Sequence, residues 1–140
     1  MEKRRSTTGY LLYVYGGPVA WKVHLQSVIA KSSVEAEYYA FSETCDEIVC
    51  HRSLLVELGI VVAGPTILYG DNKGSIDLAS APVFHKRTKH IEIRYHLIRE
   101  HIDNGIIEVI WCLTADNIAD IFTKALPTIK HVAMRGFIVG

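Results

Sequence analysis

The hydrophobic pattern divides the chain into short strands and amphipathic helices. Residues 9–15 and 19–23 are apolar and flank a Gly-Gly-Pro break, which predicts a β-hairpin. A long helix is predicted next, because Ser32 and Glu35 have the capping-box spacing and Gly59 is a typical C-terminal stop. The later pattern predicts strands at 66–69 and 106–113 and helices at 72–79, 88–102 and 115–126.

This order of elements, ββαβααβα, predicts one mixed α/β domain whose strands are covered by helices. With 140 residues, 49% of them hydrophobic and 21% charged, the chain has the composition of a globular domain rather than of a disordered segment. Its formal net charge of zero indicates no class of partner. Trp21 and Trp111 fall on predicted strands and are expected to pack in the core.

The same composition argues against membrane and secreted classes. No apolar stretch approaches the ~20 residues that span a bilayer, and the basic start MEKRRSTTGY lacks the apolar part of a signal peptide. The three cysteines have no disulfide-framework spacing, which indicates a reducing compartment. We therefore expect an intracellular protein, cytoplasmic or nuclear, with no membrane partner.

The charges are balanced over the whole chain but not locally. Residues 86–99 contain five Lys and Arg residues against the single acid Glu92. Such a cluster is typical of a phosphate-binding surface, although a solvated helix face has the same pattern. The candidate nucleic-acid contacts are Lys86, Arg87, Lys89 and Arg94.

Three acidic residues are candidates for catalysis. Asp71 directly follows a predicted buried strand, where α/β sheets place ligands, although it could instead cap the next helix. Glu37 lies in the long helix and is expected to lean toward the sheet, with a solvated surface position as the alternative. Asp120 shares a face of the last predicted helix with Asp116, and the alternative is a surface helix in which Lys124 pairs with Asp120.

If Glu37, Asp71 and Asp120 converged, they would form an oxygen-rich site of the kind that Mg²⁺ prefers. Two such ions can hold the attacking water and the leaving oxygen of a phosphodiester. Spacing alone does not show that the three side chains meet. The chain contains no zinc-finger spacing, no HExxH and no P-loop, so other metal and nucleotide sites have no support.

Five segments stand in a distinctive order along the chain: RRSTTGY (4–10), SSVEAEYYA (32–40), YGDNKGSIDLA (69–79), FHKRTKHIEIRYHLIRE (84–100) and NIADIFTKALP (117–127). Together they resemble the ribonuclease H domain of the Pol polyprotein of copia-type LTR retrotransposons. The resemblance implies a domain at residues 4–127, followed by a C-terminal tail at 128–140.

The resemblance also implies a fold and an activity. The fold would be a ribonuclease H-like mixed sheet flanked by helices, and the activity would be Mg²⁺-dependent hydrolysis of the RNA strand of RNA–DNA hybrids. Glu37, Asp71 and Asp120 match the family's catalytic and metal-binding acids, which hold two Mg²⁺ ions, with Mn²⁺ as a substitute. The implied partners are the hybrid and a reverse transcriptase domain upstream in the parent polyprotein.

One part of the family's pattern has no counterpart here. The family carries a fourth metal-binding aspartate on a central strand upstream of the RRST block, whereas the sequence begins with Met1-Glu2-Lys3-Arg4. We therefore expect a domain whose first strand is missing and whose sheet has open edges. The alternative to an active enzyme is an inactive remnant that keeps the fold and binds nucleic acid, or that forms a homodimer through an open sheet edge.

Overall fold

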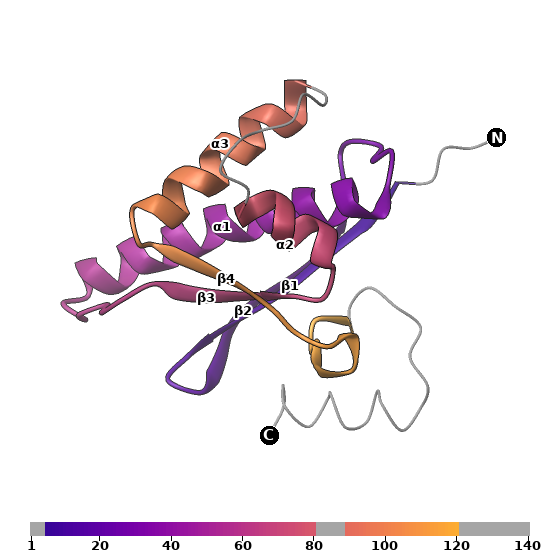
Figure 1. Cartoon of the computed structure of the whole chain (residues 1–140). Helices are drawn as coiled ribbons and strands as arrows, with labels where there is room; N and C mark the ends of the chain where they lie inside the picture. Colours follow the sequence, from indigo (N-terminus) through magenta and orange to yellow (C-terminus); the bar gives the residue numbers. More distant parts are fainter. Residues whose placement is uncertain (1–4, 81–88, 121–140) are drawn as a thin grey trace.

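The computed structural model describes residues 5–80 and 89–120, which form an α/β structure with its helices on one side of the strands (Figure 1). The predicted α/β class is therefore confirmed. The elements are β1 (Thr7–Val14), β2 (Gly17–Leu25), α1 (Ser33–Glu57), β3 (Thr66–Gly70), α2 (Lys73–Ser80), α3 (Lys89–Asp103), β4 (Ile107–Trp111) and the 3₁₀ turn η1 (Thr114–Asp116).

The predicted hairpin is present, but its turn is placed differently. β1 and β2 pair antiparallel, and the two residues between them, Tyr15 and Gly16, have φ angles of 51° and 78°. Two successive positive φ angles are typical of the tight turns whose twist suits a hairpin. Pro18 therefore lies inside β2, opposite Tyr13 at an irregularity of the pairing, and not in the turn.

The second pair of strands is parallel. β3 and β4 pair in register from Thr66 opposite Ile107 to Gly70 opposite Trp111. Among the described residues the four strands form two separate sheets, β1–β2 and β3–β4. The single mixed sheet that the resemblance implies is therefore not seen in this part of the chain.

Both ends of α1 carry the caps that the sequence predicts. The hydroxyl of Ser32 accepts a hydrogen bond from the Glu35 backbone N–H at 3.2 Å, and the Glu35 carboxylate reaches back to the Lys31 N–H at 2.7 Å. At the other end Gly59 has a φ of 76°, and the N–H of Ile60 donates to the carbonyl of Leu55. This left-handed residue ends the helix as a glycine C-cap does.

The core lies between the helices and the strands. One apolar stripe of α3 is buried, formed by Ile91, Tyr95 and Ile98. They pack in one cluster with residues of α1, which include Tyr38 and Phe41. This packing fixes α1, the helix that carries Glu37.

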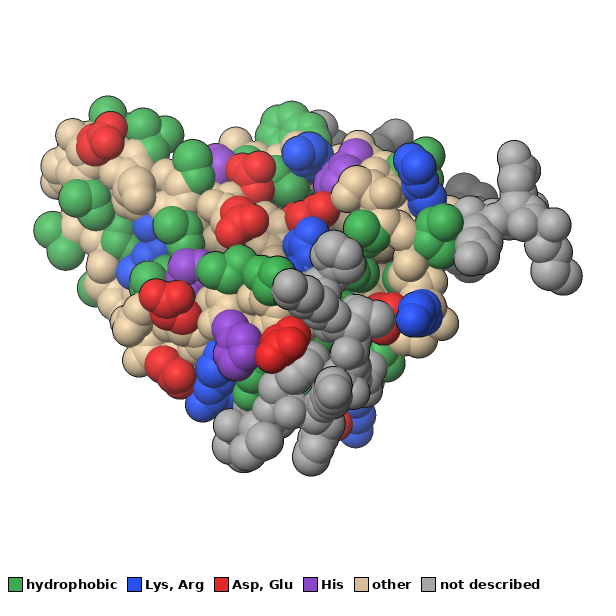
Figure 2. Space-filling model, turned by 90° about the horizontal axis from the view of Figure 1, so that it is seen from above, with side chains coloured by type: hydrophobic (Ala, Val, Ile, Leu, Met, Phe, Trp, Pro, Cys, Tyr) green, Lys and Arg blue, Asp and Glu red, His purple; other side chains and the backbone are tan. Residues whose placement is uncertain are grey.

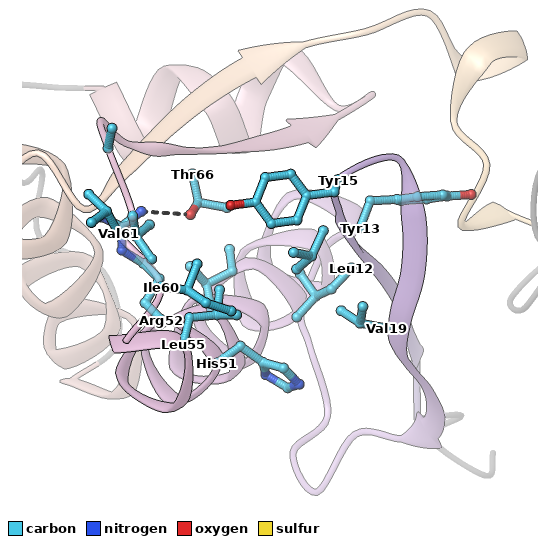
Figure 3. Close-up of a pocket in the computed structure, with 14 residues that line it drawn as sticks. Leu12, Tyr13, Tyr15, Val19, His51, Arg52, Leu55, Ile60, Val61 and Thr66 are labelled. Carbon is cyan, nitrogen blue, oxygen red and sulfur yellow. Dashed lines mark hydrogen bonds between the residues drawn. The ribbon is translucent and has the colours of Figure 1, made fainter. Parts of the chain in front are cut away.

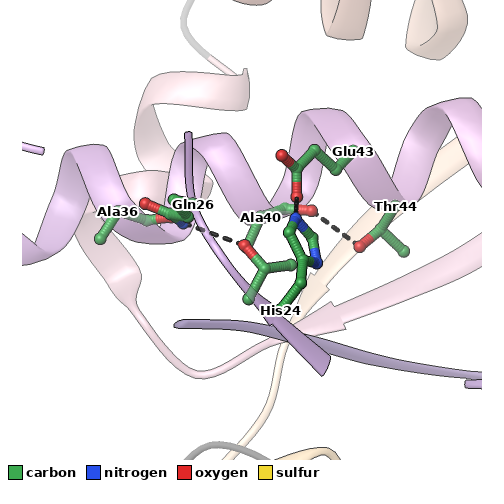
Figure 4. Close-up of polar contacts among 7 residues, drawn as sticks. His24, Gln26, Ala36, Ala40, Glu43 and Thr44 are labelled. Atoms are coloured by element: carbon green, nitrogen blue, oxygen red, sulfur yellow. Dashed lines mark hydrogen bonds and ion pairs between the residues drawn. The ribbon is translucent and has the colours of Figure 1, made fainter. Parts of the chain in front are cut away.

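Polar contacts attach the hairpin to α1 (Figure 4). The buried Gln26 side chain donates hydrogen bonds to the Thr8 hydroxyl at 3.0 Å and to the Ala36 carbonyl at 2.8 Å. His24 and Glu43 approach to 3.0 Å. A buried amide has no water to bond to and needs partners in the protein. The Gln26 bonds therefore fix the position of β1 and β2 on α1.

The expectation about the tryptophans is wrong, and the start of the last predicted helix is misplaced. Thr114–Asp116 form a 3₁₀ turn, further turns follow, and Asp120 is the first α-helical residue after them, while 121–126 lie outside the described residues. Trp21 and Trp111 are 59% and 41% exposed rather than buried in the core. β2 exposes apolar side chains along one face, which alternation alone does not predict: Val19, Trp21, Val23 and Leu25.

The proposed domain limits, 4–127 with a tail at 128–140, remain predictions, because Arg4 and all residues after Asp120 lie outside the described ranges. Among the residues that are described, no helix is long and apolar enough to cross a membrane.

Candidate functional site

Glu37 and Asp120 line one pocket, although they are far apart in the sequence. The pocket has a volume of about 300 Å³ and lies where the first turns of α1 meet the segment after η1. Asp120 is only 3% exposed, and its backbone N–H donates to the carbonyl of Asn117 at 3.2 Å. Glu37 is half-buried on α1, so it faces the pocket rather than open solvent. The fold thus brings together two of the three predicted acids.

Asp71 lies at the end of β3 and is half-buried. The helix cap that could have accounted for it is formed by Asn72 instead, whose side-chain oxygen accepts from the Ser75 N–H at 3.1 Å. The Asp71 carbonyl accepts a hydrogen bond from the Trp111 indole N–H at 3.2 Å. The alternative role of Asp71 as the cap of α2 is therefore not supported.

Cys112 lies among the acidic residues of the candidate site. Burial raises the pKa of Cys112, and the negative charges of Asp71, Asp116 and Asp120 raise it further. The Cys112 N–H donates to the Gly70 carbonyl at 2.8 Å, and Gly70, Cys112 and Ala119 line one groove, so the residues before Asp71 and Asp120 lie at the same end of the β3–β4 pair. Asp116 is exposed and Asp120 is buried, so the two do not share a helix face as expected.

The three acids offer only carboxylate oxygens, the donors that a hard cation such as Mg²⁺ prefers. Within residues 5–80 and 89–120, no three His, Cys, Asp or Glu side chains are close enough together to hold one ion. Mg²⁺ is nevertheless usually bound through one or two carboxylates, with waters and substrate phosphates as its other ligands. The Glu37 and Asp120 pair meets that requirement, and metal binding by the three acids remains a prediction.

The candidate basic contacts are only partly described. The Arg94 guanidinium lies 4.5 Å from the centroid of the Tyr39 ring, a cation–π contact between α3 and α1. Lys86 and Arg87, and the side chain of Lys89, lie outside the described residues. On the helical face in Figure 2, basic and acidic side chains are interspersed, and Arg99 pairs with Asp103 at 3.1 Å. This part of the basic stretch has the character of a solvated helix face.

Sequence reasoning missed two residues beside Asp71. Trp111 ends β4 with its ring partly exposed, and the Lys73 ammonium lies 4.8 Å from the ring centroid. An exposed aromatic ring next to a cation can contact both a base and a phosphate. The signal in the sequence was a tryptophan at the end of a strand, next to the carboxyl-end position of Asp71.

A second cavity lies at the other end of the molecule (Figure 3). It has a volume of about 240 Å³ and lies between the hairpin tip and the α1–β3 connection. Arg52 at its wall donates hydrogen bonds to the Gly64 carbonyl at 3.0 Å and to the Thr66 hydroxyl at 2.9 Å. No Asp or Glu is among its lining residues, so this cavity lacks the carboxylates that a hard cation such as Mg²⁺ prefers.

Three transposon polyproteins are similar to most of this chain. It is 40% identical over 132 residues to the retrovirus-related Pol polyprotein from transposon RE2 of Arabidopsis thaliana, a match that covers 94% of this chain. It is 40% identical over 130 residues to the corresponding polyprotein from transposon TNT 1-94 of Nicotiana tabacum, covering 93% of the chain. It is 42% identical over 121 residues to that from transposon RE1 of Arabidopsis thaliana, covering 86%.

These homologues are copia-type retrotransposon Pol polyproteins. The chain spans only 9%, 10% and 8% of their lengths, so it corresponds to a small part of each. No family model matches the chain. No solved structure matches it.

Proposed function

We propose that this chain is the ribonuclease H module of a copia-type retrotransposon Pol polyprotein and that it hydrolyses the RNA strand of RNA–DNA hybrids. The observation that carries the proposal is the pocket shared by Glu37 and Asp120; Glu37 also lines a groove with Gly70, the residue before Asp71. Homology to Pol polyproteins over most of the chain supports the same activity. An intracellular site of action and a reverse transcriptase domain upstream in the parent polyprotein belong to this proposal.

Each acid has a role in this proposal. Bound Mg²⁺, or Mn²⁺ in its place, would activate a water molecule and offset the charge that develops on the scissile phosphate. Glu37 and Asp120 would hold the cation within their common pocket, and Asp71 would complete the carboxylate set from the end of β3. The products would carry 5′-phosphate and 3′-hydroxyl ends.

Basic side chains would hold the substrate, and the shape of its minor groove would identify the RNA strand. Lys86, Arg87, Lys89 and Arg94 would contact the phosphate backbone, which predicts binding that weakens steeply as salt rises. The 2′-hydroxyl groups in the wide minor groove would distinguish the RNA strand from DNA. Arg94 is already positioned by its stacking on Tyr39, so its guanidinium needs little further ordering to bind.

The test is cleavage of a labelled RNA–DNA hybrid by the full chain with Mg²⁺, compared with Asp71→Asn. Loss of a carboxylate that takes part in the chemistry should lower the rate by at least ~10²-fold, and a chelator should abolish cleavage. Asp77→Asn is the matched control, because Asp77 is exposed on α2 only six positions further along the chain.

Hybrid binding, measured by fluorescence anisotropy on the same samples, separates two failures. A folded chain that binds the hybrid and does not cut it would contradict the nuclease proposal and would leave nucleic-acid binding as its function. Equal cleavage by Asp71→Asn and by the unmodified chain would contradict the role of Asp71.

A further inference from the structure

The outer face of the β1–β2 hairpin is apolar and exposed. Side chains alternate between the two faces of a strand, and the buried Thr8 of β1 lies on the face toward α1, where Gln26 joins it to that helix. On the opposite face, β2 exposes four apolar side chains by 46% to 63%, which together form the β2 stripe: Val19, Trp21, Val23 and Leu25. A row of large apolar side chains that no helix covers is typical of a contact surface.

No charged side chain lies on this outer face, within the two strands as described. Among their residues only Lys22 and His24 can carry a positive charge, and none is acidic. Lys22 pairs with Tyr10 and His24 pairs with Thr8, so both belong to the face toward α1. There His24 meets Glu43 of α1 (Figure 4). The outer face therefore lacks the charges that usually keep exposed strands apart.

The lack of charge decides what can cover the β2 stripe. Nucleic acid is held mainly through contacts of Lys and Arg with phosphates, and interfacial membrane binding combines apolar with basic side chains. The outer face offers no basic side chain for either. A second copy of the same face does fit, because a two-fold contact brings identical patches together and no like charges would oppose each other. The net charge of the chain is zero, so two copies do not repel each other at a distance.

We propose that two copies of this chain associate face to face through the β2 stripe, about a two-fold axis near Trp21 and Val23. Stacked sheets pack ~10 Å apart, which lets side chains of the two inner faces interdigitate. Trp21 is the largest side chain of the stripe and would be the main anchor, since tryptophan dominates the energetics of many interfaces. The contact uses the face of the hairpin and not a strand edge.

The size of the β2 stripe determines how strong the contact is. An exposed patch of four such side chains is on the order of 400 Å², about half of the ~800 Å² that each partner buries in a stable interface. We therefore expect a reversible dimer with a Kd of roughly 10–100 µM and not a permanent one. Because no charged side chain contributes, raising the salt concentration should not weaken it.

The experiment is sedimentation equilibrium of the full chain between about 1 and 300 µM, a range that includes the expected Kd. The average mass should rise from that of a monomer toward that of a dimer. Val23→Lys places like charges opposite each other and should weaken the dimer by at least tenfold. Val56→Lys is the matched control, because it makes the same change at an exposed position of α1 and should leave the Kd unchanged.

A mixture of two variants tests the symmetry of the contact. Val23→Glu alone should be monomeric, as Val23→Lys is, whereas an equimolar mixture of the two should associate, because opposite charges then meet near the axis. Thermal melting of each variant establishes that it is folded. If the charged variants do not fold, Trp21→Thr replaces them, since threonine suits a strand and adds no charge, and it should also weaken the dimer by at least tenfold.

Several results would overturn the proposal. A chain that is monomeric at every concentration has no such contact, and an equal Kd for Val23→Lys would place the contact on another surface. Failure of the mixed variants to associate would mean that the contact is not symmetric about this point. A monomer that binds neutral phosphatidylcholine vesicles, and loses that binding in Val23→Lys, would make a lipid surface the occupant. Sedimentation measures mass and not cleavage, so these outcomes leave the nuclease proposal to its own test.

Discussion

Replacing Gly70 by alanine would place a methyl group against the ring of Phe41. Gly70 is the last residue of β3, immediately before Asp71, and it is buried. A β-carbon built there would lie 2.7 Å from Cε1 of Phe41, closer than real β-carbons come to other atoms, and 3.6 Å from Cδ1 of Ile76. Either the Phe41 ring or the end of β3 must therefore move.

The magnitude follows from the packing. Adding a methyl group to a filled core typically costs ~1–3 kcal/mol, because side chains leave their preferred rotamers. For a chain of this length, each kcal/mol of lost stability lowers the melting temperature by about 4 °C, a value between those of smaller and larger domains. We expect Gly70→Ala to melt roughly 4–12 °C below its control.

The control is Gly17→Ala, in which the new β-carbon would meet only the Val14 carbonyl at 3.7 Å. Both changes reduce the entropy of the unfolded chain equally, so the difference between them isolates the clash. Thermal melting by circular dichroism measures it. Adding Phe41→Leu to Gly70→Ala should recover part of the loss, because leucine has no ring at that point. Equal melting temperatures for Gly70→Ala and Gly17→Ala would refute the reasoning.

Three further changes test other parts of the structure. Gln26→Leu removes the donor to Thr8 and to the Ala36 carbonyl, so urea unfolding should show a loss of ~1–3 kcal/mol, and unchanged stability would contradict the role of Gln26 in holding the hairpin. Ser32→Ala removes the N-cap acceptor of α1 and should cost about 1 kcal/mol, whereas an unchanged urea midpoint would contradict the cap. Burial raises the pKa of the Cys45 thiol from 9.0 to about 12, and burial with the nearby Glu47 raises the pKa of Tyr10 from 10.0 to about 12. The folded chain keeps these protons where the unfolded chain releases them, so the free energy of unfolding should fall as the pH rises from about 9 to about 12, and a flat profile would contradict the burial of both groups.

Features set by neighbouring residues were predictable from the sequence. The caps of α1 depend on Ser32, Glu35 and Gly59, each within one turn of the helix end, and all three act as expected. The hairpin was predictable as well, but its turn was not, because it places Tyr15 in the left-handed region that glycine usually occupies. A prediction that assigns the turn to glycine and proline therefore places it too late.

Features set by distant contacts were not predictable in the same way. The pocket shared by Glu37 and Asp120 joins α1 to the segment after η1, and no local pattern encodes that contact. The pattern suggested that one regular helix carries both Asp116 and Asp120, whereas non-helical residues 117–119 separate the 3₁₀ turn with Asp116 from the helical Asp120. The exposure of Trp21 and Trp111 depends on which face of each sheet the helices cover. The alternation of side chains along a strand does not indicate which face that is.

The central claim is that the buried carboxylate of Asp120 acts with Glu37 in hybrid cleavage. The most direct measurement is the Mg²⁺-dependent cleavage rate of Asp120→Asn beside Asp116→Asn, two identical changes four residues apart at a buried and an exposed position. The account predicts a fall of at least ~10²-fold for Asp120→Asn and a rate close to that of the unmodified chain for Asp116→Asn. Equal rates in the two variants, with hybrid binding intact in both, would contradict it.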